Sequence, residues 1–277
     1  MSESYAVVIG RESFVRRHPV FSYFGLTYAI SWTGALLVVS THLMRREAVR
    51  KLGGVLMFPA MLLGPSVAAL ILTRLLDGRA GVAELFARMR EISFGLRWYR
   101  MLLVPPGLVF AVLLCLKTFV SATYAPNHFL PGLGFGLLAG FFEKIGWMGF
   151  AFPRMRRYWG PFASAALLGV LWGAWHLPVI DFLGAATPHG PYLVPFFLAF
   201  TASLTAMREL IAFVYTRTKS VLLAQLMHAS STSALAVLSP PGASAAQEVV
   251  WYVVYGAALW VVVGAGLDGT AFAAWLQ

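Results

Sequence analysis

The sequence predicts an all-α, polytopic membrane protein with about eight transmembrane helices and one interfacial amphipathic segment. Of its 277 residues, 59% are hydrophobic and only 12% are charged, whereas soluble domains usually carry about twice that charged fraction. Apolar runs of about 20 residues, long enough to cross a hydrocarbon core of roughly 30 Å, recur along nearly the whole chain. These runs are continuous rather than alternating, which argues against a transmembrane barrel. We expect residues 1–277 to form a single integral membrane domain.

Breaks rich in Arg, Pro and Gly separate the apolar runs, as in PRMRRYWGP (153–161). The stretch 78–97 instead mixes apolar residues with arginines, which is typical of an amphipathic segment lying at the membrane interface. The expected spans are 20–43, 54–76, 99–121, 130–152, 161–183, 191–214, 220–238 and 248–272.

The net charge of +10 does not indicate a nucleic-acid partner, because the basic residues cluster in short loops, where they set topology and meet anionic lipid headgroups. With eight spans, the N-terminus and the loops after spans two, four and six share one side, which holds 14 Lys and Arg residues against 5 on the other. The positive-inside bias therefore predicts a multi-pass protein of the cell membrane with both termini in the cytoplasm. The first loop, 44–53, is basic although it lies on the other side.

Two further features narrow the class of protein. The apolar run after Pro19 is too long for a cleavable signal and lacks a small-residue cleavage site. The one cysteine, Cys115, lies inside an apolar run, so the chain has no disulfide framework of its own and no Cys-rich metal site.

A few ionisable residues remain inside the expected spans, where they are rare and costly, so function is the default hypothesis for them. They are Glu143, Lys144, His176, Arg208, Glu209 and His228. Arg208 and Glu209 lie near the cytoplasmic end of their span, where a snorkelling side chain is the simpler explanation.

Depth singles out three of these residues. At 1.5 Å rise per residue, Glu143 lies roughly 15 Å, His176 roughly 22 Å and His228 roughly 12 Å above the cytoplasmic ends of their spans. Helix tilt covers that spread, so a carboxylate and two imidazoles from three helices can converge. Thr232 follows His228 by four residues and shares its helix face.

Such a set permits three kinds of chemistry. A shielded carboxylate beside an imidazole can act as a general base on water, while a second imidazole and a hydroxyl stabilise an oxyanion, which describes amide hydrolysis. Glu with two His is also a plausible zinc set. The third alternative is the proton relay of a transporter, although a transporter would be expected to show paired repeats and interrupted helices.

The surrounding residues resemble the CPBP intramembrane proteases, the family of type II CAAX prenyl endopeptidases and bacteriocin-processing proteins. Its signature is EExxxR, often within EExGWxG, then FxxxH, then HxxxN or HxxxD. Here the three parts read EKIGWMG from Glu143, WGAWHLP with Trp172 and His176, and HASST with His228 and Thr232. The resemblance covers roughly residues 60–238, including GPSVAALILTRLLDGRAGVAELFARM (64–89), LRWYRMLLVPP (96–106) and YTRTKSVLLAQLMHAS (215–230).

The resemblance implies a role for each motif residue. Glu143 would activate water beside His176, and His228 with Thr232 would form the oxyanion site, where a Thr hydroxyl replaces the commoner Asn and can still donate a hydrogen bond. Trp147 and Trp172 would support the site. No cofactor is required on this reading, and Glu143, His176 and His228 would be metal ligands only if the protein were a zinc enzyme.

Two positions depart from the signature: Lys144 stands in place of the second Glu, and Met148 in place of the Arg. Both halves of an expected intrahelical ion pair are therefore absent. Lys144 is about 100° round the helix from Glu143, so the two need not face each other. A lysine that did reach Glu143 would weaken it as a base. The alternative is a lysine that is neutral or stretched toward the headgroups.

The sequence therefore predicts an intramembrane metallo- or glutamate-dependent endopeptidase that cleaves a membrane-associated peptide or a lipidated, CAAX-like protein. The alternative, favoured by Lys144 and Met148, is a non-catalytic relative that acts as a membrane binding scaffold or a bacteriocin-immunity-type factor.

Overall fold

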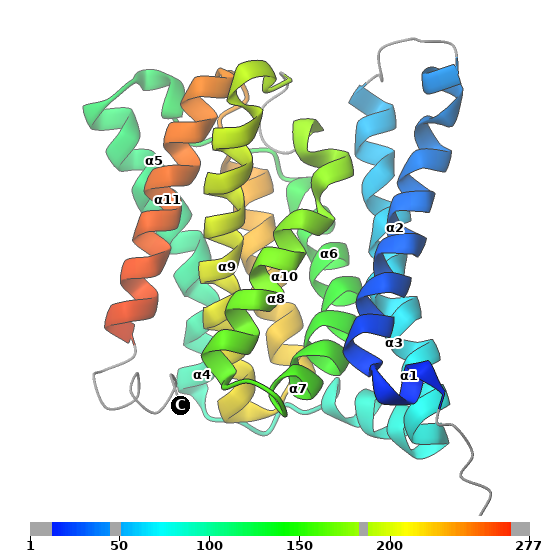
Figure 1. Ribbon diagram of the computed structural model, residues 1–277. Coiled ribbons are helices and arrows are strands. Elements are labelled where there is room, and N and C mark those ends of the chain that lie inside the picture. Colours follow the sequence, from blue (N-terminus) through cyan, green and yellow to red (C-terminus); the bar gives the residue numbers. More distant parts are fainter. Residues whose placement is uncertain (1–12, 45–50, 183–187, 267–277) are drawn as a thin grey trace, which may run out of the picture.

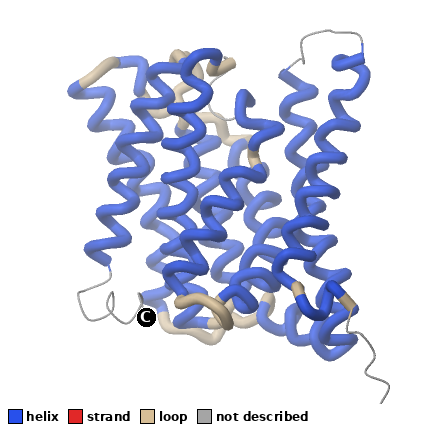
Figure 2. The backbone as a smooth tube through the Cα atoms, viewed as in Figure 1, coloured by secondary structure: helices blue, strands red, loops and turns tan. Residues whose placement is uncertain are grey.

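The computed structural model describes residues 13–44, 51–182 and 188–266, which form helices joined by short connections, with no strand among them (Figures 1 and 2). The α-helices are α1 (Phe14–Arg17), α2 (Pro19–Met44), α3 (Lys51–Arg88), α4 (Leu96–Arg100), α5 (Val104–Phe119), α6 (Gly132–Gly146), α7 (Phe152–Met155), α8 (Pro161–Trp175), α9 (Leu193–Thr218), α10 (Val221–Leu238) and α11 (Ala245–Gly266). The 3₁₀ segments are η1 (Met101–Leu103), η2 (Ala122–Tyr124), η4 (Leu177–Phe182) and η5 (Gly190–Tyr192), and η3 (Trp147–Ala151) is a π-helix.

Within the described residues, seven helical runs are long and apolar enough to cross a membrane. They are Pro19–Ser40, Leu56–Arg88, Leu96–Phe119, Gly132–Met155, Gly190–Thr218, Val221–Leu238 and Ala245–Ala265. Their main axes run roughly side by side in one bundle (Figure 1). The prediction of an all-α polytopic membrane protein is confirmed.

The expected span 161–183 is not one continuous helix. The α-helix α8 has 15 residues and ends at Trp175, and the chain continues as the 3₁₀ segment η4. Pro178 explains the break, because it has no N–H to donate to the carbonyl four residues earlier and its ring clashes with that carbonyl. The Trp32 indole of α2 donates a hydrogen bond of 3.1 Å to the Trp175 carbonyl, which satisfies an acceptor at the helix end. His176 lies at this break.

The second span is longer than the expected 54–76. Helix α3 runs to Arg88 with a kink at Gly78, where φ is 71° and ψ is −158°, a conformation that glycine tolerates. Beyond the kink the helix turns across the lower end of the bundle (Figure 1), so the expected interfacial segment begins as a helix. Arg88 donates to the Tyr215 hydroxyl at 2.8 Å and to the Gly149 carbonyl at 3.1 Å, and thereby ties this segment to α9 and η3.

Two other span ends differ from expectation. Helix α9 continues to Thr218, four residues past the expected end, and Lys219 follows it in a left-handed conformation with φ 58°. Helix α11 starts at Ala245, three residues earlier than expected. The expected end of that span at 272 lies outside the described residues.

Helices α6 and α10 pack closely because small residues line their contact. An added Cβ at Gly140 would lie 2.6 Å from the Gln225 carbonyl oxygen and 2.7 Å from the Ala229 nitrogen, and one at Gly136 would lie 2.4 Å from the Ser233 nitrogen. Small residues at this spacing let two membrane helices approach backbone to backbone. This contact places the end of α6 beside the middle of α10.

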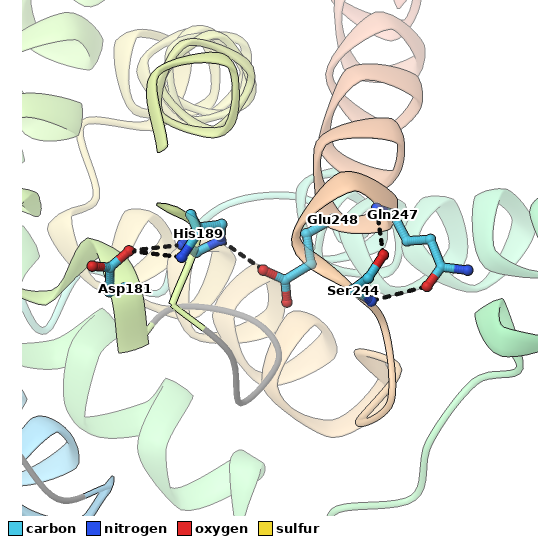
Figure 3. A network of polar contacts seen from close by, with 5 residues as sticks. All are labelled: Asp181, His189, Ser244, Gln247 and Glu248. Atoms are coloured by element: carbon cyan, nitrogen blue, oxygen red, sulfur yellow. Dashed lines mark hydrogen bonds and ion pairs between the residues drawn. The ribbon is translucent and has the colours of Figure 1, made fainter. Parts of the chain in front are cut away.

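A cluster of ionisable side chains joins η4 to α11 (Figure 3). The buried His189 ring contacts Asp181 of η4 through Nδ1 at 3.0 Å and Glu248 of α11 through Nε2 at 2.7 Å. The ring also stacks on Phe196 with centroids 3.7 Å apart. A protonated imidazole donates from both nitrogens, so it can bind both carboxylates at once. Burial lowers the pKa of His189, but the hydrogen bonds to Glu248 and Asp181 outweigh it and leave the pKa above its usual value.

We expect this cluster to make thermal stability depend on pH. Because the folded-state pKa of His189 is raised, its contribution is fully present at low pH and is lost as the pH rises above the unfolded value of about 6.5 and passes through the folded pKa. His189→Gln should lower the unfolding midpoint by about 2–4 °C at pH 6 and remove this part of the pH dependence. Thermal unfolding in detergent between pH 5 and 9 measures it, with exposed His128→Gln as control; equal pH profiles for wild type and His189→Gln would contradict it.

Candidate active site

The end of α6, the end of α8 and the middle of α10 bring Glu143, His176 and His228 into one buried cluster. Trp172 joins them. Its Nε1–H donates a hydrogen bond of 2.6 Å to Glu143 Oε2, its carbonyl accepts one of 2.7 Å from His176 Nδ1, and its ring meets the His228 ring edge to face with centroids 4.9 Å apart. The exposed fractions of the three predicted residues are 3%, 7% and 2% respectively.

The backbone contact of His176 fixes which of its nitrogens can accept a proton. A carbonyl oxygen only accepts hydrogen bonds, so Nδ1 carries the hydrogen that is donated to Trp172, and in the neutral ring Nε2 is the acceptor. The ring is held between Trp175, at a centroid distance of 4.8 Å, and Phe200, at 5.3 Å. His176 thus presents a basic nitrogen from a rigid position.

His228 has an uncommitted ring nitrogen. Its Nδ1 is buried and has no hydrogen-bond partner within the described part of the chain. Thr232 lies one turn further along α10 and is half-buried, so the two side chains share a helix face as the spacing predicts. A buried, unpaired nitrogen is costly, which is consistent with a group that binds a ligand.

The two predicted supporting tryptophans differ in position. Trp172 contacts Glu143 directly, whereas the buried Trp147 indole nitrogen has no hydrogen-bond partner in the described ranges. The Trp147 ring packs on Tyr23 with centroids 5.5 Å apart and on Trp175 at 6.1 Å. Trp147, the first residue of η3, therefore helps to hold α2 and α8 together beside the end of α6.

The backbone directly after Glu143 is irregular. Residues Trp147–Ala151 form the π-helix η3 between α6 and α7, and all five are buried. A π-helix inside a longer helix is rare and frequent at functional sites. Met148, which stands where the signature has Arg, is fully buried in this turn and packs as an apolar side chain.

The cluster also contains two basic side chains, Lys144 and Arg208, whose position there was not predicted from the sequence. Lys144 and Arg208 have no exposed surface, and the Lys144 Nζ and Arg208 Cζ each lie 4.2 Å from the centroid of the Trp172 ring, a cation–π geometry. Both interact electrostatically with Glu143. Lys144 is therefore inside the site rather than stretched toward the headgroups.

The expectation that Arg208 snorkels is wrong. Because α9 continues to Thr218, Arg208 is ten residues from the helix end, or about 15 Å at 1.5 Å per residue, which is the depth estimated for Glu143. The expected end at residue 214 made Arg208 look shallow. The signal in the sequence that could have indicated a buried Arg208 is its position well inside a long apolar run, which forms the 26-residue helix α9.

Glu143, His176 and His228 would be metal ligands only in a zinc enzyme. Among the described residues, no three His, Cys, Asp or Glu side chains form a group that could hold a metal ion.

The part of the chain that carries this cluster is similar to known proteins. Residues 125–234 match the family described as type II CAAX prenyl endopeptidase Rce1-like, and this range contains Glu143, His176, His228 and Thr232. The chain is also similar to CAAX prenyl protease 2 of Methanococcus maripaludis, with 26% identity over 174 residues, which is 57% of this chain and 60% of that protein. The match thus spans less than two thirds of that relative's length. The resemblance read from the motifs is confirmed: residues 125–234, which carry the site residues, are similar to the type II CAAX prenyl endopeptidase Rce1-like family.

Proposed function

We propose that this protein is an intramembrane endopeptidase that hydrolyses peptide bonds of membrane-associated or lipidated substrates with a water activated by Glu143. The observation that carries the proposal is the junction at Trp172, which contacts Glu143, His176 and His228 from three separate elements. The similarity of residues 125–234 to the type II CAAX prenyl endopeptidase Rce1-like family supports the same reaction class.

The geometry supports the following sequence of proton transfer, addition to the carbonyl and bond cleavage. Glu143, assisted by the free Nε2 of His176, removes a proton from water, and the resulting hydroxide adds to the carbonyl carbon of the scissile bond. A ring N–H of His228 and the Thr232 hydroxyl donate hydrogen bonds to the oxyanion that forms. The carboxyl of Glu143 then returns the proton to the amide nitrogen, and the C–N bond breaks to release an amine and a carboxylic acid.

An apolar groove supports a substrate that arrives from the lipid. It has a volume of about 290 Å³ and lies between α6 and α10. Its lining includes Leu137, Phe141 and Phe142 of α6 and Leu222, Leu226 and Ala229 of α10. Phe142 and Ala229 are the direct sequence neighbours of Glu143 and His228, so the groove lies along the same turns of α6 and α10 as the cluster.

The charge distribution supports a cell-membrane location with cytoplasmic termini. The described residues at the two ends of the chain, α1 and the end of α11, lie at the same lower end of the bundle (Figure 1). The basic segment before α8 and the Arg217–Lys219 turn after α9 lie at this end too (Figure 1). The positive-inside rule assigns such an end to the cytoplasm.

Cleavage of a peptide library tests the proposal. The full chain, purified in detergent or in nanodiscs, is incubated with the library, and mass spectrometry identifies the products. We expect specific cleavage that His228→Ala abolishes while the variant keeps its helical content and its unfolding midpoint. We also expect cleavage to persist in the presence of a chelator. Absence of any cleavage above that of the folded variant would exclude the protease function.

One observation favours the second candidate, a non-catalytic binding scaffold or immunity-type factor. Lys144 interacts electrostatically with Glu143, and a cation so close competes with a water proton for the carboxylate. The double change Lys144→Glu with Met148→Arg restores the signature and separates the two candidates. Peptide cleavage by the double variant but not by wild type would support the non-catalytic scaffold. Equal cleavage by wild type and the double variant would support the enzyme.

We expect Trp172→Phe to reduce kcat about tenfold or more and to change KM less. The substitution keeps an aromatic ring but removes the N–H that holds Glu143 Oε2 at 2.6 Å, and a charge-assisted hydrogen bond that orients a base acts mainly on the chemical step. Steady-state kinetics on a cleaved library peptide measures both constants. Trp251→Phe is the matched control, because this buried tryptophan of α11 lies outside the cluster. An unchanged kcat in Trp172→Phe would contradict the assigned role.

A further inference from the structure

Lys144 and Arg208 are two buried basic side chains that have no hydrogen-bond partner among the described residues. The Lys144 Nζ and all three side-chain nitrogens of Arg208 lack an acceptor within the described ranges of the chain. Neither side chain has exposed surface. Burying charged donors without acceptors costs free energy, and functional sites are where such unsatisfied groups are expected to gain a partner.

The two cations come from different helices and converge on one ring. Lys144 belongs to α6 and Arg208 to α9, and each lies 4.2 Å from the Trp172 ring centroid. The ring satisfies part of their electrostatic demand, but it accepts no conventional hydrogen bond. A guanidinium presents five donors that match the geometry of a carboxylate or phosphate, and these donors are unpaired here.

The carboxylate of the cluster does not satisfy them. Glu143 interacts electrostatically with both side chains, but the hydrogen bond that it accepts at 2.6 Å comes from the Trp172 indole. His176 and His228, the other polar groups against the Trp172 ring, cannot neutralise a cation. An anion beside Trp172 would meet two positive groups.

We propose that Lys144 and Arg208 form a binding site for a carboxylate of the peptide substrate, next to the bond that Glu143 attacks. The assignment of this carboxylate to a substrate rests on the proposed protease function. Lys144, Arg208 and Glu143 all lie around one indole, so the bound carboxylate is within about two residues of the scissile bond, at roughly 3.5 Å per residue. It is either the C-terminal carboxylate or that of an Asp or Glu side chain, and both present the same chemistry.

Peptide binding to the full-length Glu143→Gln protein tests the site without any need for hydrolysis. Three fluorescent peptides share one apolar sequence: one ends in a free acid, one ends in an amide, and one ends in an amide but carries a Glu near the C-terminus. We expect one of the two anionic peptides to bind at least tenfold more tightly than the neutral amide. Which of them binds tells a terminal carboxylate from a side-chain carboxylate.

Variants then assign the preference to the two cations. Added to Glu143→Gln, Lys144→Met or Arg208→Gln should reduce the preference to less than about threefold, whereas Arg208→Lys should keep part of it. Lys117→Met and Arg157→Gln remove cations that are exposed and should leave the preference unchanged. Thermal unfolding confirms that each variant is folded.

Several results would overturn the inference. They are equal binding of all three peptides, no binding of any peptide, or a preference that survives in both Lys144→Met and Arg208→Gln. Stronger competition by dodecyl phosphate than by the anionic peptide would assign the site to a lipid headgroup and also overturn it. The carboxylate site and the protease function can fail separately. If wild type cleaves acidic and neutral peptides equally, only the carboxylate site is overturned. If Glu143→Gln prefers the anionic peptide although wild type cleaves none, only the protease function is overturned.

Discussion

Glu143→Gln is expected to reduce peptide hydrolysis by about 10³-fold or more while the protein remains folded. The substitution keeps the size and shape of the side chain, and its carbonyl oxygen can still accept the Trp172 hydrogen bond. It removes the carboxylate that is the proposed general base. General base catalysis typically contributes about 10²–10⁴-fold to the rate. Single-turnover hydrolysis of a library peptide measures the loss.

A matched substitution distinguishes loss of the base from loss of charge. Glu84→Gln changes a carboxylate that is 73% exposed and forms a surface ion pair with Arg88, so its effect on activity should be less than about twofold. The unfolding midpoint of Glu143→Gln should fall, because the substitution leaves the buried Lys144 and Arg208 without their charge partner. If Glu143→Gln retained more than a tenth of the wild-type rate, another residue or a bound group would have to activate the water.

Gly140→Leu is expected to disrupt the site from a distance. A Cβ at this position would lie 2.6 Å from the Gln225 carbonyl oxygen, so α6 and α10 must move apart. Overpacking typically costs about 1–3 kcal/mol, occasionally more, which lowers the unfolding midpoint by several degrees. Glu143 lies on α6 and His228 on α10, and a misplacement of about 1 Å between reacting groups can cost about 10²-fold in rate. Thermal unfolding and kcat measurements give both effects.

Gly134→Leu is the control on the same helix. Gly134 is exposed, and an added Cβ there would meet no atom within 4 Å. It should therefore change neither the unfolding midpoint nor the rate appreciably. Comparable loss in both variants would mean that leucine in α6 is harmful for a reason other than the contact with α10.

Composition and hydrophobic run length determined the fold class. Most elements follow from continuous apolar runs, because in lipid a backbone can satisfy its hydrogen bonds only within a helix or a closed barrel. The main error concerned α8, where apolar residues continue to 182 although the helix ends at Trp175. The apolar pattern is the same on both sides of Pro178, so hydropathy alone does not register the break.

The sequence also predicted which residues carry the chemistry. Glu143, His176 and His228 stood out because charged and polar groups are rare in apolar spans, and the motif spacing assigned them to separate helices. Their shared burial around Trp172 agrees with this choice. Their proposed catalytic roles stay predictions.

Only the tertiary structure decided what surrounds those residues. Whether Lys144 turns inward, and whether Arg208 lies at the same depth as Glu143, depends on the rotation of α6 and on the end of α9, which hydrophobicity does not specify. Close packing of α6 on α10 and of α8 on α9 brings both cations onto the Trp172 ring. Residues 144 and 208 are distant in sequence and meet only because the helices pack, so their pairing has no signature in the linear chain.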